Sequence, residues 1–306
     1  MRLSSRLSRP LSARALSAAG TLALLATAAA PVAVAGSASA TPALVAKDPA
    51  TVRTIAHRGA RYVAPENTLV AIKAAIARDA DFVEVDVQRS KDGRLVLVHD
   101  TNLRRTTNIE RVFPKKKSYA VRDTTWAQMK KLDAGKWKSK KYAGTRIPSL
   151  KQAVRLVQRN RTGIMIELKS PKRYPGVEQE VSTALRQIDG YFGRAVRDER
   201  LTIQSFDFDA VHTFKQIEPR VHVALLGTPA VTALPDLARW ADEISSRHRT
   251  VDADYVAAVH ALGMDSSVWT VDTVENMNAS LDKGVDAVVT NRPTLLGRVL
   301  QQRSAG

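Results

Sequence analysis

The chain has 306 residues, a formal net charge of +17 and no cysteine. Its fold must therefore be held by a hydrophobic core alone, which excludes a disulfide framework. The basic charge favours an anionic partner, although a generally basic surface explains it equally well. No motif combines aromatic and basic residues as nucleic-acid-binding domains do, so we expect no nucleic-acid partner.

The first forty residues have the pattern of a secretory signal peptide. The segment before the apolar run contains four arginines and no acidic residue. The apolar run occupies 21–35, and Ala38-Ser39-Ala40 supplies a cleavage signal. The apolar run is shorter than the roughly 18 to 20 residues that a membrane span needs, and it contains Pro31. We expect cleavage near Ala40, secretion of the mature chain and a linker at 41–52.

Short β-rich runs alternate with amphipathic helical patterns from residue 53 to residue 303. Eight such strands over about 250 residues predict one α/β domain, a (β/α)8 TIM barrel. The expected strands are 53–56, 82–87, 163–168, 201–205, 222–226, 243–246, 266–271 and 287–290. The expected helices include 69–78, 177–188, 208–217, 231–240, 252–262, 274–283 and 294–301. A doubly wound open sheet is the competing interpretation, but no G-x-G-x-x-G motif follows the first strand.

A further β-rich run, 94–99, follows the second strand too closely for a helical crossover. Lys91-Asp92-Gly93 is a turn signal, so we expect an antiparallel hairpin. The expected register pairs Glu84 with His99 and Asp86 with Leu97, which brings the histidine beside the first acid. A parallel third strand is the alternative.

Residues 101–148 form a long interval without a barrel strand, which we interpret as a lid or a small insertion after the second strand region. Its part from 111 to 141 holds eleven basic and two acidic residues. This basic segment is either a rim that attracts an anionic cell-wall polymer or a membrane surface, or a solvated loop without a binding role.

Charged side chains stand near the ends of three predicted strands. Residues i and i+2 of a strand share a face, so Glu84 lies beside Asp86, and Glu167 beside Lys169. Barrel enzymes hold their active sites at these C-terminal strand ends. Three converging carboxylates would repel one another without a cation. Oxygen ligands predict a hard divalent ion, Ca2+ or Mg2+, whereas unconnected surface carboxylates are the alternative.

Two histidines are candidates for proton transfer near neutral pH, namely His57 and His99. Arg58 and Lys169 supply fixed positive charge of the kind that suits a phosphoryl group. The remaining histidines have no matching acid in the sequence pattern, so we expect structural or surface roles for them. These are His212, His222, His248 and His260.

The chain resembles the glycerophosphodiester phosphodiesterase family through a series of motifs that runs along most of residues 57–293. The motifs are His57-Arg58-Gly59, Pro65-Glu66-Asn67-Thr68, Glu84-Val85-Asp86, Asp92-Gly93, His99-Asp100, 103–108, 132–135, 146–150, Glu167-Leu168-Lys169, Gln204-Ser205-Phe206, Trp269-Thr270-Val271 and 290–293. Each fragment is weak by itself, but their combination in this order is specific. The resemblance implies a barrel enzyme that hydrolyses glycerophosphodiesters to sn-glycerol 3-phosphate and an alcohol with one divalent cation.

The resemblance also implies roles for individual residues. The implied metal ligands are Glu84, Asp86 and Glu167, the implied acid and base are His57 and His99, and the implied substrate-binding residues are Arg58, Lys169, Glu66, Gln204 and Trp269. Water or the substrate's own glycerol hydroxyl can serve as the nucleophile. Position 291, where the family often has Asp, is Asn here. We expect that position to close the barrel rather than to take part in chemistry.

Two other functions compete with this interpretation. A related barrel could act on lipid or teichoic-acid phosphodiesters in the manner of sphingomyelinase D, which shares the paired histidines and the acid cluster. A non-catalytic phosphodiester-binding protein would not need both histidines and all three acids, yet all are present. The motif set therefore favours the glycerophosphodiester phosphodiesterase.

Overall fold

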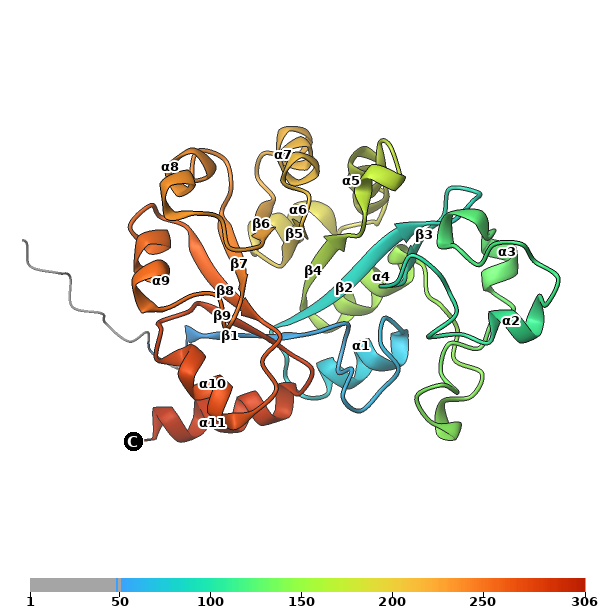
Figure 1. The fold of residues 1–306 in the computed structure, drawn as a ribbon, viewed down its shortest axis with the longest axis horizontal. Coiled ribbons are helices and arrows are strands. Elements are labelled where there is room, and N and C mark those ends of the chain that lie inside the picture. The colour runs from blue at the N-terminus through green and yellow to red at the C-terminus, as the bar shows by residue number, and fades with distance from the viewer. Residues whose placement is uncertain (1–47, 49–50, 306) are drawn as a thin grey trace, which may run out of the picture. The chain divides into compact units, whose positions relative to one another are not determined.

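A computed structural model describes residues 48 and 51–305 of the chain. The predicted signal peptide and most of the predicted linker lie outside the described residues. Eight parallel strands form a closed barrel that helices surround, which confirms the predicted (β/α)8 fold (Figure 1). The barrel closes because β1 pairs with both β2 and β9. The barrel strands are β1 (Arg53–Ala56), β2 (Phe82–Arg89), β4 (Gly163–Leu168), β5 (Leu201–Ser205), β6 (His222–Leu226), β7 (Glu243–Arg247), β8 (Asp265–Trp269) and β9 (Ala287–Thr290).

The helices around the barrel are α1 (Leu69–Ile76), α4 (Leu150–Asn160), α5 (Val177–Arg186), α6 (Phe192–Arg197), α7 (Phe208–Ile217), α8 (Leu234–Leu237), α9 (Ala253–His260), α10 (Val274–Leu281) and α11 (Pro293–Ser304). Most of them lie close to the predicted ranges, but one was predicted too long and two, α4 and α6, were not predicted. The predicted helix at 231–240 was too long, because a 3-10 turn at Val231–Ala233 precedes the short α8. The sequence analysis missed α4, although Ser149 and Gln152 form a capping box at its start. In the described part of the chain, no helix has the length and apolar character to cross a membrane.

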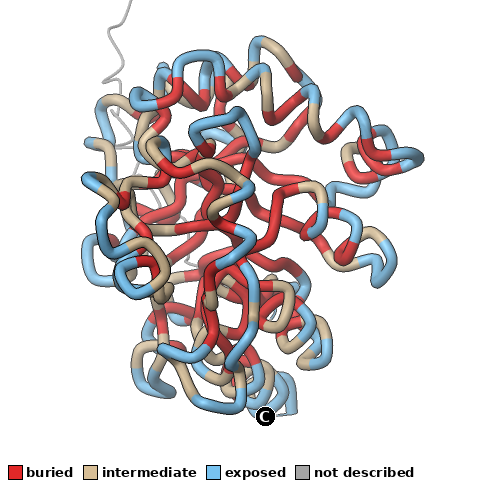
Figure 2. The backbone as a smooth tube through the Cα atoms, turned by 90° about the vertical axis from the view of Figure 1, so that its right-hand side faces the viewer, coloured by how far each residue is buried: buried red, intermediate tan, exposed pale blue. Residues whose placement is uncertain are grey.

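Buried residues concentrate in the strands, while exposed residues follow the outer helices and loops (Figure 2). The main core lies between the strands and the surrounding helices. A smaller core fills the barrel interior and consists of Ile55, Phe82, Met165, Ala287 and Val289. Both faces of the strands are therefore covered, which explains why β2, β4 and β5 are almost continuously buried.

The predicted hairpin is present, but its register was wrong by one residue. β3 (Leu95–Leu97) runs antiparallel to β2 and pairs Leu97 with Val87 rather than with Asp86. The turn has three residues, centred on Asp92, and Gly93 adopts a φ of 82°. Such a loop pairs Ser90 with Arg94 and moves each expected partner by one position.

The insertion after β3 is a folded subdomain with its own small core. It contains α2 (Ile109–Val112) and α3 (Trp126–Met129), which lie beyond β3 and apart from the barrel helices in Figure 1. The core of the insertion includes Leu103, Ile109, Val121, Met129 and Leu132. Lysines cover its outside and form a basic surface. The exposed ones are Lys115, Lys117, Lys130, Lys131, Lys136, Lys140 and Lys141.

Candidate active site

The C-terminal ends of the barrel strands bring the predicted site residues together. A cavity of about 130 Å³ lies there. Eight of the ten predicted residues line it, namely His57, Arg58, Glu84, His99, Glu167, Lys169, Gln204 and Trp269. Asp86 lies next to the cavity, between the charges of Arg58 and Lys169. Glu66 is the one predicted residue that stands further back.

Three carboxylates form the acidic part of the site. Glu84 and Asp86 follow each other on one face of β2, and Asp86 pairs in register with Glu167 of β4. Their side chains are almost fully buried, with exposed fractions of 1%, 1% and 7% for Glu84, Asp86 and Glu167. One ligand atom of each lies within 4.8 Å of the others. This geometry allows one ion to contact all three groups.

The hydrogen bonding of these acids fits a bound cation. Among the described residues, Glu84 Oε1 and Asp86 Oδ1 are buried and have no hydrogen-bond partner. Burial, followed by the charge of Asp86, raises the pKa of Glu84 well above its usual range and that of Glu167 to about 8. Ca2+ and Mg2+ bind carboxylate oxygens, and buried carboxylate oxygens that accept no hydrogen bond are free to act as such ligands. The residues therefore fit a hard divalent ion.

Two cationic side chains border the acid cluster. The backbone N–H of Arg58 donates to Glu84 Oε2 at 2.7 Å, and Arg58 Nε lies 3.4 Å from Asp86 Oδ2. Lys169 Nζ lies 2.6 Å from Glu167 Oε1 and 3.5 Å from Asp86 Oδ1. Burial would raise the pKa of Asp86, but the charges of Arg58 and Lys169 outweigh it and lower that pKa. The positive charges thus lie at the cavity, where a phosphoryl group can contact them.

Glu66 supports Arg58 from behind. Arg58 Nη1 donates to Glu66 Oε1 at 2.9 Å, Arg61 Nε to Oε2 at 2.7 Å, and Arg105 Nη2 to Oε1 at 2.6 Å. Burial opposes the charged carboxylate, but the hydrogen bond from Arg105 and the charges of Arg58 and Arg61 lower its pKa. Both oxygens are taken by guanidinium groups, so this arrangement orients Arg58 for its contact with the cavity.

His57 directly follows β1, and its imidazole contacts Asn291, the residue that the sequence analysis assigned to barrel closure. Its Nδ1 lies 2.8 Å from Oδ1 of Asn291, which follows β9. Position 291 is therefore in contact with a candidate catalytic group, because barrel closure pairs β9 with β1 and brings the two strand ends together. Burial and the charge of Arg58 lower the pKa of His57 to about 4, so the imidazole is neutral at neutral pH.

His99 has a different support. Its Nδ1 lies 2.8 Å from Asp100 Oδ1, and Arg105 donates to both oxygens of Asp100 at 2.7 and 2.9 Å. The hydrogen bonds from Arg105 lower the pKa of Asp100 to about 2. Burial lowers the pKa of His99, although Asp86 and Asp100 act in the opposite direction. Arg105 was missed in the sequence, where it was one of several arginines in an insertion.

Two aromatic residues form the apolar wall of the cavity. Trp269 meets Phe206 edge to face, with ring centroids 5.5 Å apart, and its indole N–H donates to Ser245 O. Phe206 is 54% exposed. It also lines an adjoining groove of about 720 Å³, together with Lys169 and Lys172. The Gln-Ser-Phe motif carried Phe206, but its place at the junction of two cavities depends on the fold.

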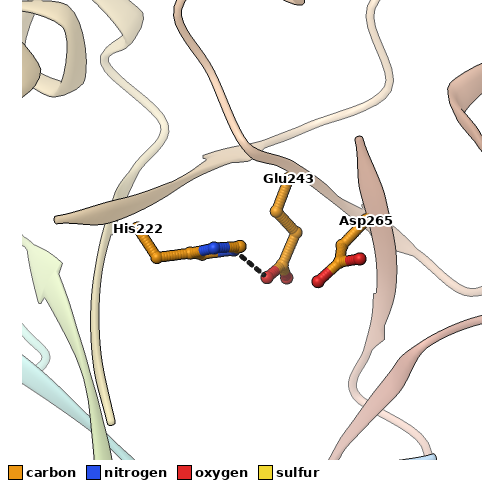
Figure 3. A group of neighbouring side chains, drawn as sticks. All are labelled: His222, Glu243 and Asp265. Carbon is orange, nitrogen blue, oxygen red and sulfur yellow. Dashed lines mark hydrogen bonds and ion pairs between the residues drawn. The ribbon is translucent and has the colours of Figure 1, made fainter. Parts of the chain in front are cut away.

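A second group of polar side chains lies at the opposite, N-terminal ends of the strands. Figure 3 shows Glu243 between His222 and Asp265, the first residues of β7, β6 and β8. His222 Nε2 lies 3.1 Å from Glu243 Oε2. The prediction that this histidine has no matching acid was therefore wrong, as it was for His260, which lies 2.8 Å from Asp286. Both acids are distant in sequence and meet their histidine only across the sheet or from a helix.

This group offers ligand atoms within 4.8 Å of one another, but an arginine already supplies its positive charge. Arg53 Nη2 lies 2.6 Å from Asp265 Oδ2 and 3.9 Å from Glu243 Oε2. Ser267 also donates to Glu243. Residues at the N-terminal end of a TIM barrel usually serve stability rather than catalysis. We therefore assign the group to the stability of the barrel.

The pair of His222 and Glu243 predicts a pH-dependent stability. Burial would lower the pKa of His222, but the hydrogen bond and the charge of Glu243 raise it above 6.5. The stabilisation is complete below the unfolded-state pKa and is lost as pH rises through the raised folded-state pKa. We expect His222→Gln to lower the free energy of unfolding by about 1.5–3 kcal/mol in mildly acidic buffer and by less in alkaline buffer.

Denaturant unfolding at the two pH values measures this difference. His212→Gln is the matched control, because His212 is exposed and contacts Trp240 rather than an acid. An equal loss for His222→Gln in acidic and alkaline buffer would contradict the proposed charge pairing.

Comparisons with known proteins agree with the geometry. A family model, "Glycerophosphoryl diester phosphodiesterase family", matches residues 57–295. The glycerophosphodiester phosphodiesterase of Bacillus subtilis (strain 168) is 31% identical over 265 residues, covering 82% of this chain and 87% of that protein. The one of Caldanaerobacter subterraneus subsp. tengcongensis is 33% identical over 245 residues, covering 79% and 95%.

The solved structures agree as well. A phosphodiesterase of Oleispira antarctica, in complex with the product sn-glycerol-3-phosphate, has a TM-score of 0.71 and 26% identity to this chain. The match covers 81% of this chain and 96% of that one. The family match spans the barrel from the end of β1 onward and includes every residue that lines the cavity. This chain therefore belongs to the glycerophosphoryl diester phosphodiesterase family.

Proposed function

We propose that the protein hydrolyses glycerophosphodiesters to sn-glycerol 3-phosphate and an alcohol, with one divalent cation, Ca2+ or Mg2+. The observation that carries the proposal is one cavity that joins two histidines, buried carboxylates and two cationic side chains. Family membership supports the reaction class. The product complex of the Oleispira protein supports sn-glycerol 3-phosphate as the product.

Each group has a separate part in this reaction. A cation held by Glu84, Asp86 and Glu167 would supply a Lewis acid for a phosphoryl oxygen. Arg58 and Lys169 bind the phosphodiester and stabilise the charge that develops on its oxygens. One histidine takes the proton of the attacking hydroxyl as the new O–P bond forms. The other donates a proton to the leaving oxygen as its P–O bond breaks.

Release of glycerol 3-phosphate from glycerophosphocholine tests the proposal directly. The purified protein is assayed with Ca2+, with Mg2+ and with a chelator. We expect release with at least one of the two ions and only background release with the chelator, since the buried acids need a cation between them. A folded protein that releases no glycerol 3-phosphate with either ion would overturn the proposal.

The same assay addresses the basic surface of the insertion. We propose that its exposed lysines attract an anionic polymer or membrane surface, because they lie on a folded subdomain that adjoins the site through His99. A polymeric glycerol phosphate is then a better substrate at low salt, and its advantage over glycerophosphocholine falls as salt screens the lysines. An advantage that does not change with salt would contradict this role.

A further inference from the structure

A separate cavity of about 270 Å³ lies between the loop that follows β1 and the start of α11. Tyr62 of that loop and Arg292, directly before α11, line it, and the backbone N–H of Tyr62 donates to Asn291 O at 3.2 Å. Asn291 also lines the cavity and contacts His57, yet no described residue lines both this cavity and that of the active site. The cavity is therefore a neighbour of the active site with walls of its own.

Three arginines line this cavity, and no acidic residue of the described chain does. They are Arg78, Arg292 and Arg298. The described residues include every Asp and Glu of the sequence, and none of these acids forms an ion pair with the three arginines. Arg58 and Arg105, in contrast, are paired with carboxylates. A cleft lined by one sign of charge concentrates ions of the opposite sign, so this arginine-lined cavity favours an anion.

An aromatic ring rather than an acid holds Arg292 in place. Its guanidinium carbon lies 3.8 Å from the centroid of the Tyr62 ring, and Tyr62 is 55% exposed. Stacking uses the flat face of the guanidinium and leaves the N–H groups at its edge for an acceptor. Among the described residues, Nε of Arg292 is buried and has no hydrogen-bond partner. A buried N–H without an acceptor is costly, so the geometry requires an oxygen acceptor here.

The start of α11 adds to the positive charge. The helix has 12 residues, and no side chain caps its N-terminus. Thr294, whose backbone N–H belongs to the first turn, lines the cavity. Helix N-termini carry a partial positive charge and bind phosphate groups through such N–H groups. A guanidinium can donate to two phosphate oxygens at once. These donors therefore match the several oxygens of a phosphate group better than a monatomic anion.

We propose that the arginine-lined cavity is a phosphate-binding site, separate from the catalytic cavity, in which Arg78, Arg292 and Arg298 hold one phosphate group. Its volume lies below the about 300–1,000 Å³ of pockets for drug-sized ligands, which suits one small group. The group belongs either to a free phosphate anion or to the neighbouring unit of a glycerol phosphate chain whose other phosphodiester is in the catalytic cavity. Only the second source rests on the proposed function.

Chemical modification of arginine tests the site residue by residue. Phenylglyoxal reacts with guanidinium groups, and mass spectrometry of peptides measures the rate at each arginine. Inorganic phosphate at ten times its Kd should slow the modification of Arg292 and Arg298 about 10-fold, compared with chloride at the same ionic strength. Arg155 is the control, because it is exposed on α4 and does not line the cavity. Equal rates with phosphate and chloride at Arg292 and Arg298, or equal slowing at Arg155, would overturn the proposal.

Variants of Arg298 measure the affinity of the same site. Equilibrium dialysis with inorganic phosphate counts the bound anions, and a charged hydrogen bond contributes enough that Arg298→Gln should weaken one of them at least about 10-fold. Arg155→Gln removes the same charge elsewhere and should bind phosphate as the wild type does. Arg298 is exposed, so the variant tests the site without a change in the core, and thermal unfolding checks its fold. Wild-type phosphate affinity at every site in a folded Arg298→Gln would contradict the proposal.

Two substrates distinguish the sources of the phosphate group. A short glycerol phosphate oligomer has a neighbouring phosphate, whereas glycerophosphocholine has only the one that reacts. A higher KM of Arg298→Gln for the oligomer alone assigns the site to a substrate chain. Unchanged KM values together with weakened phosphate binding assign it to free phosphate. The binding measurements do not need turnover, so an inactive wild type that still protects Arg292 and Arg298 would overturn the proposed function and leave this site in place.

Discussion

Replacement of His57 or His99 by alanine is expected to lower the turnover of glycerophosphocholine by about 10²–10⁴-fold, the usual contribution of a general acid or base. Both residues line the cavity beside Glu84 and Glu167. Each is held at Nδ1 by a separate partner, Asn291 or Asp100. The other ring nitrogen of each histidine is therefore available for proton transfer. Loss of either imidazole removes one of the two proton transfers of the reaction.

Steady-state kinetics with saturating metal measures this loss. His248→Ala is the control, since His248 does not line the cavity and should keep wild-type turnover. Unfolding curves of the two active-site variants should stay close to that of the wild type. Near-normal turnover in either variant would remove that histidine from the mechanism.

Replacement of Glu84 by glutamine is expected to abolish the response to metal. Glu84 Oε2 accepts the backbone N–H of Arg58, and a glutamine can keep that bond through its oxygen. Its amide nitrogen then takes the place of Oε1, the buried oxygen that has no hydrogen-bond partner in the described part of the chain. A cation would face a donor rather than an acceptor. A loss of about 3 kcal/mol of transition-state stabilisation lowers the rate about 10²-fold.

Thermal unfolding provides a second measurement that does not depend on activity. A ligand at 100 times its Kd stabilises a protein by about 2.7 kcal/mol, so Ca2+ or Mg2+ should raise the midpoint of the wild type. Glu84→Gln should show no such rise, whereas without metal it should be at least as stable as the wild type, because one buried charge is gone. The exposed Glu110→Gln is the control. Metal-dependent activity that survived in Glu84→Gln would exclude Glu84 as a ligand.

The sequence predicted what depends on local pattern. Alternation of strands and helices indicated the barrel, and the i, i+2 spacing placed Glu84 beside Asp86 on one face of β2. The C-terminal strand ends then indicated where these residues converge. Even the missed helix α4 had a local signal, since Ser149 and Gln152 form a capping box at its start.

The sequence could not predict contacts that only barrel closure creates. Asn291 reaches His57 because the last strand pairs with the first, and 234 residues separate the two. Glu243 meets His222 across neighbouring strands, and no local pattern links the two because they are 21 positions apart, with α8 between them. The hairpin register depended on whether the turn has two or three residues, and a difference of one residue changes every pair.

The two histidines of the site are carried by different packing units. His57 directly follows β1 of the barrel, whereas His99 directly follows Val98, which belongs with Val96 to the separate core of the insertion. Strand β2 connects the two units, because it pairs with β1 on one side and with β3 on the other. The buried side chain of Gln88 on β2 also donates to the carbonyl oxygens of Val98 and Asp100, the residues on either side of His99. The separation of the two histidines is therefore set by one buried strand of the barrel.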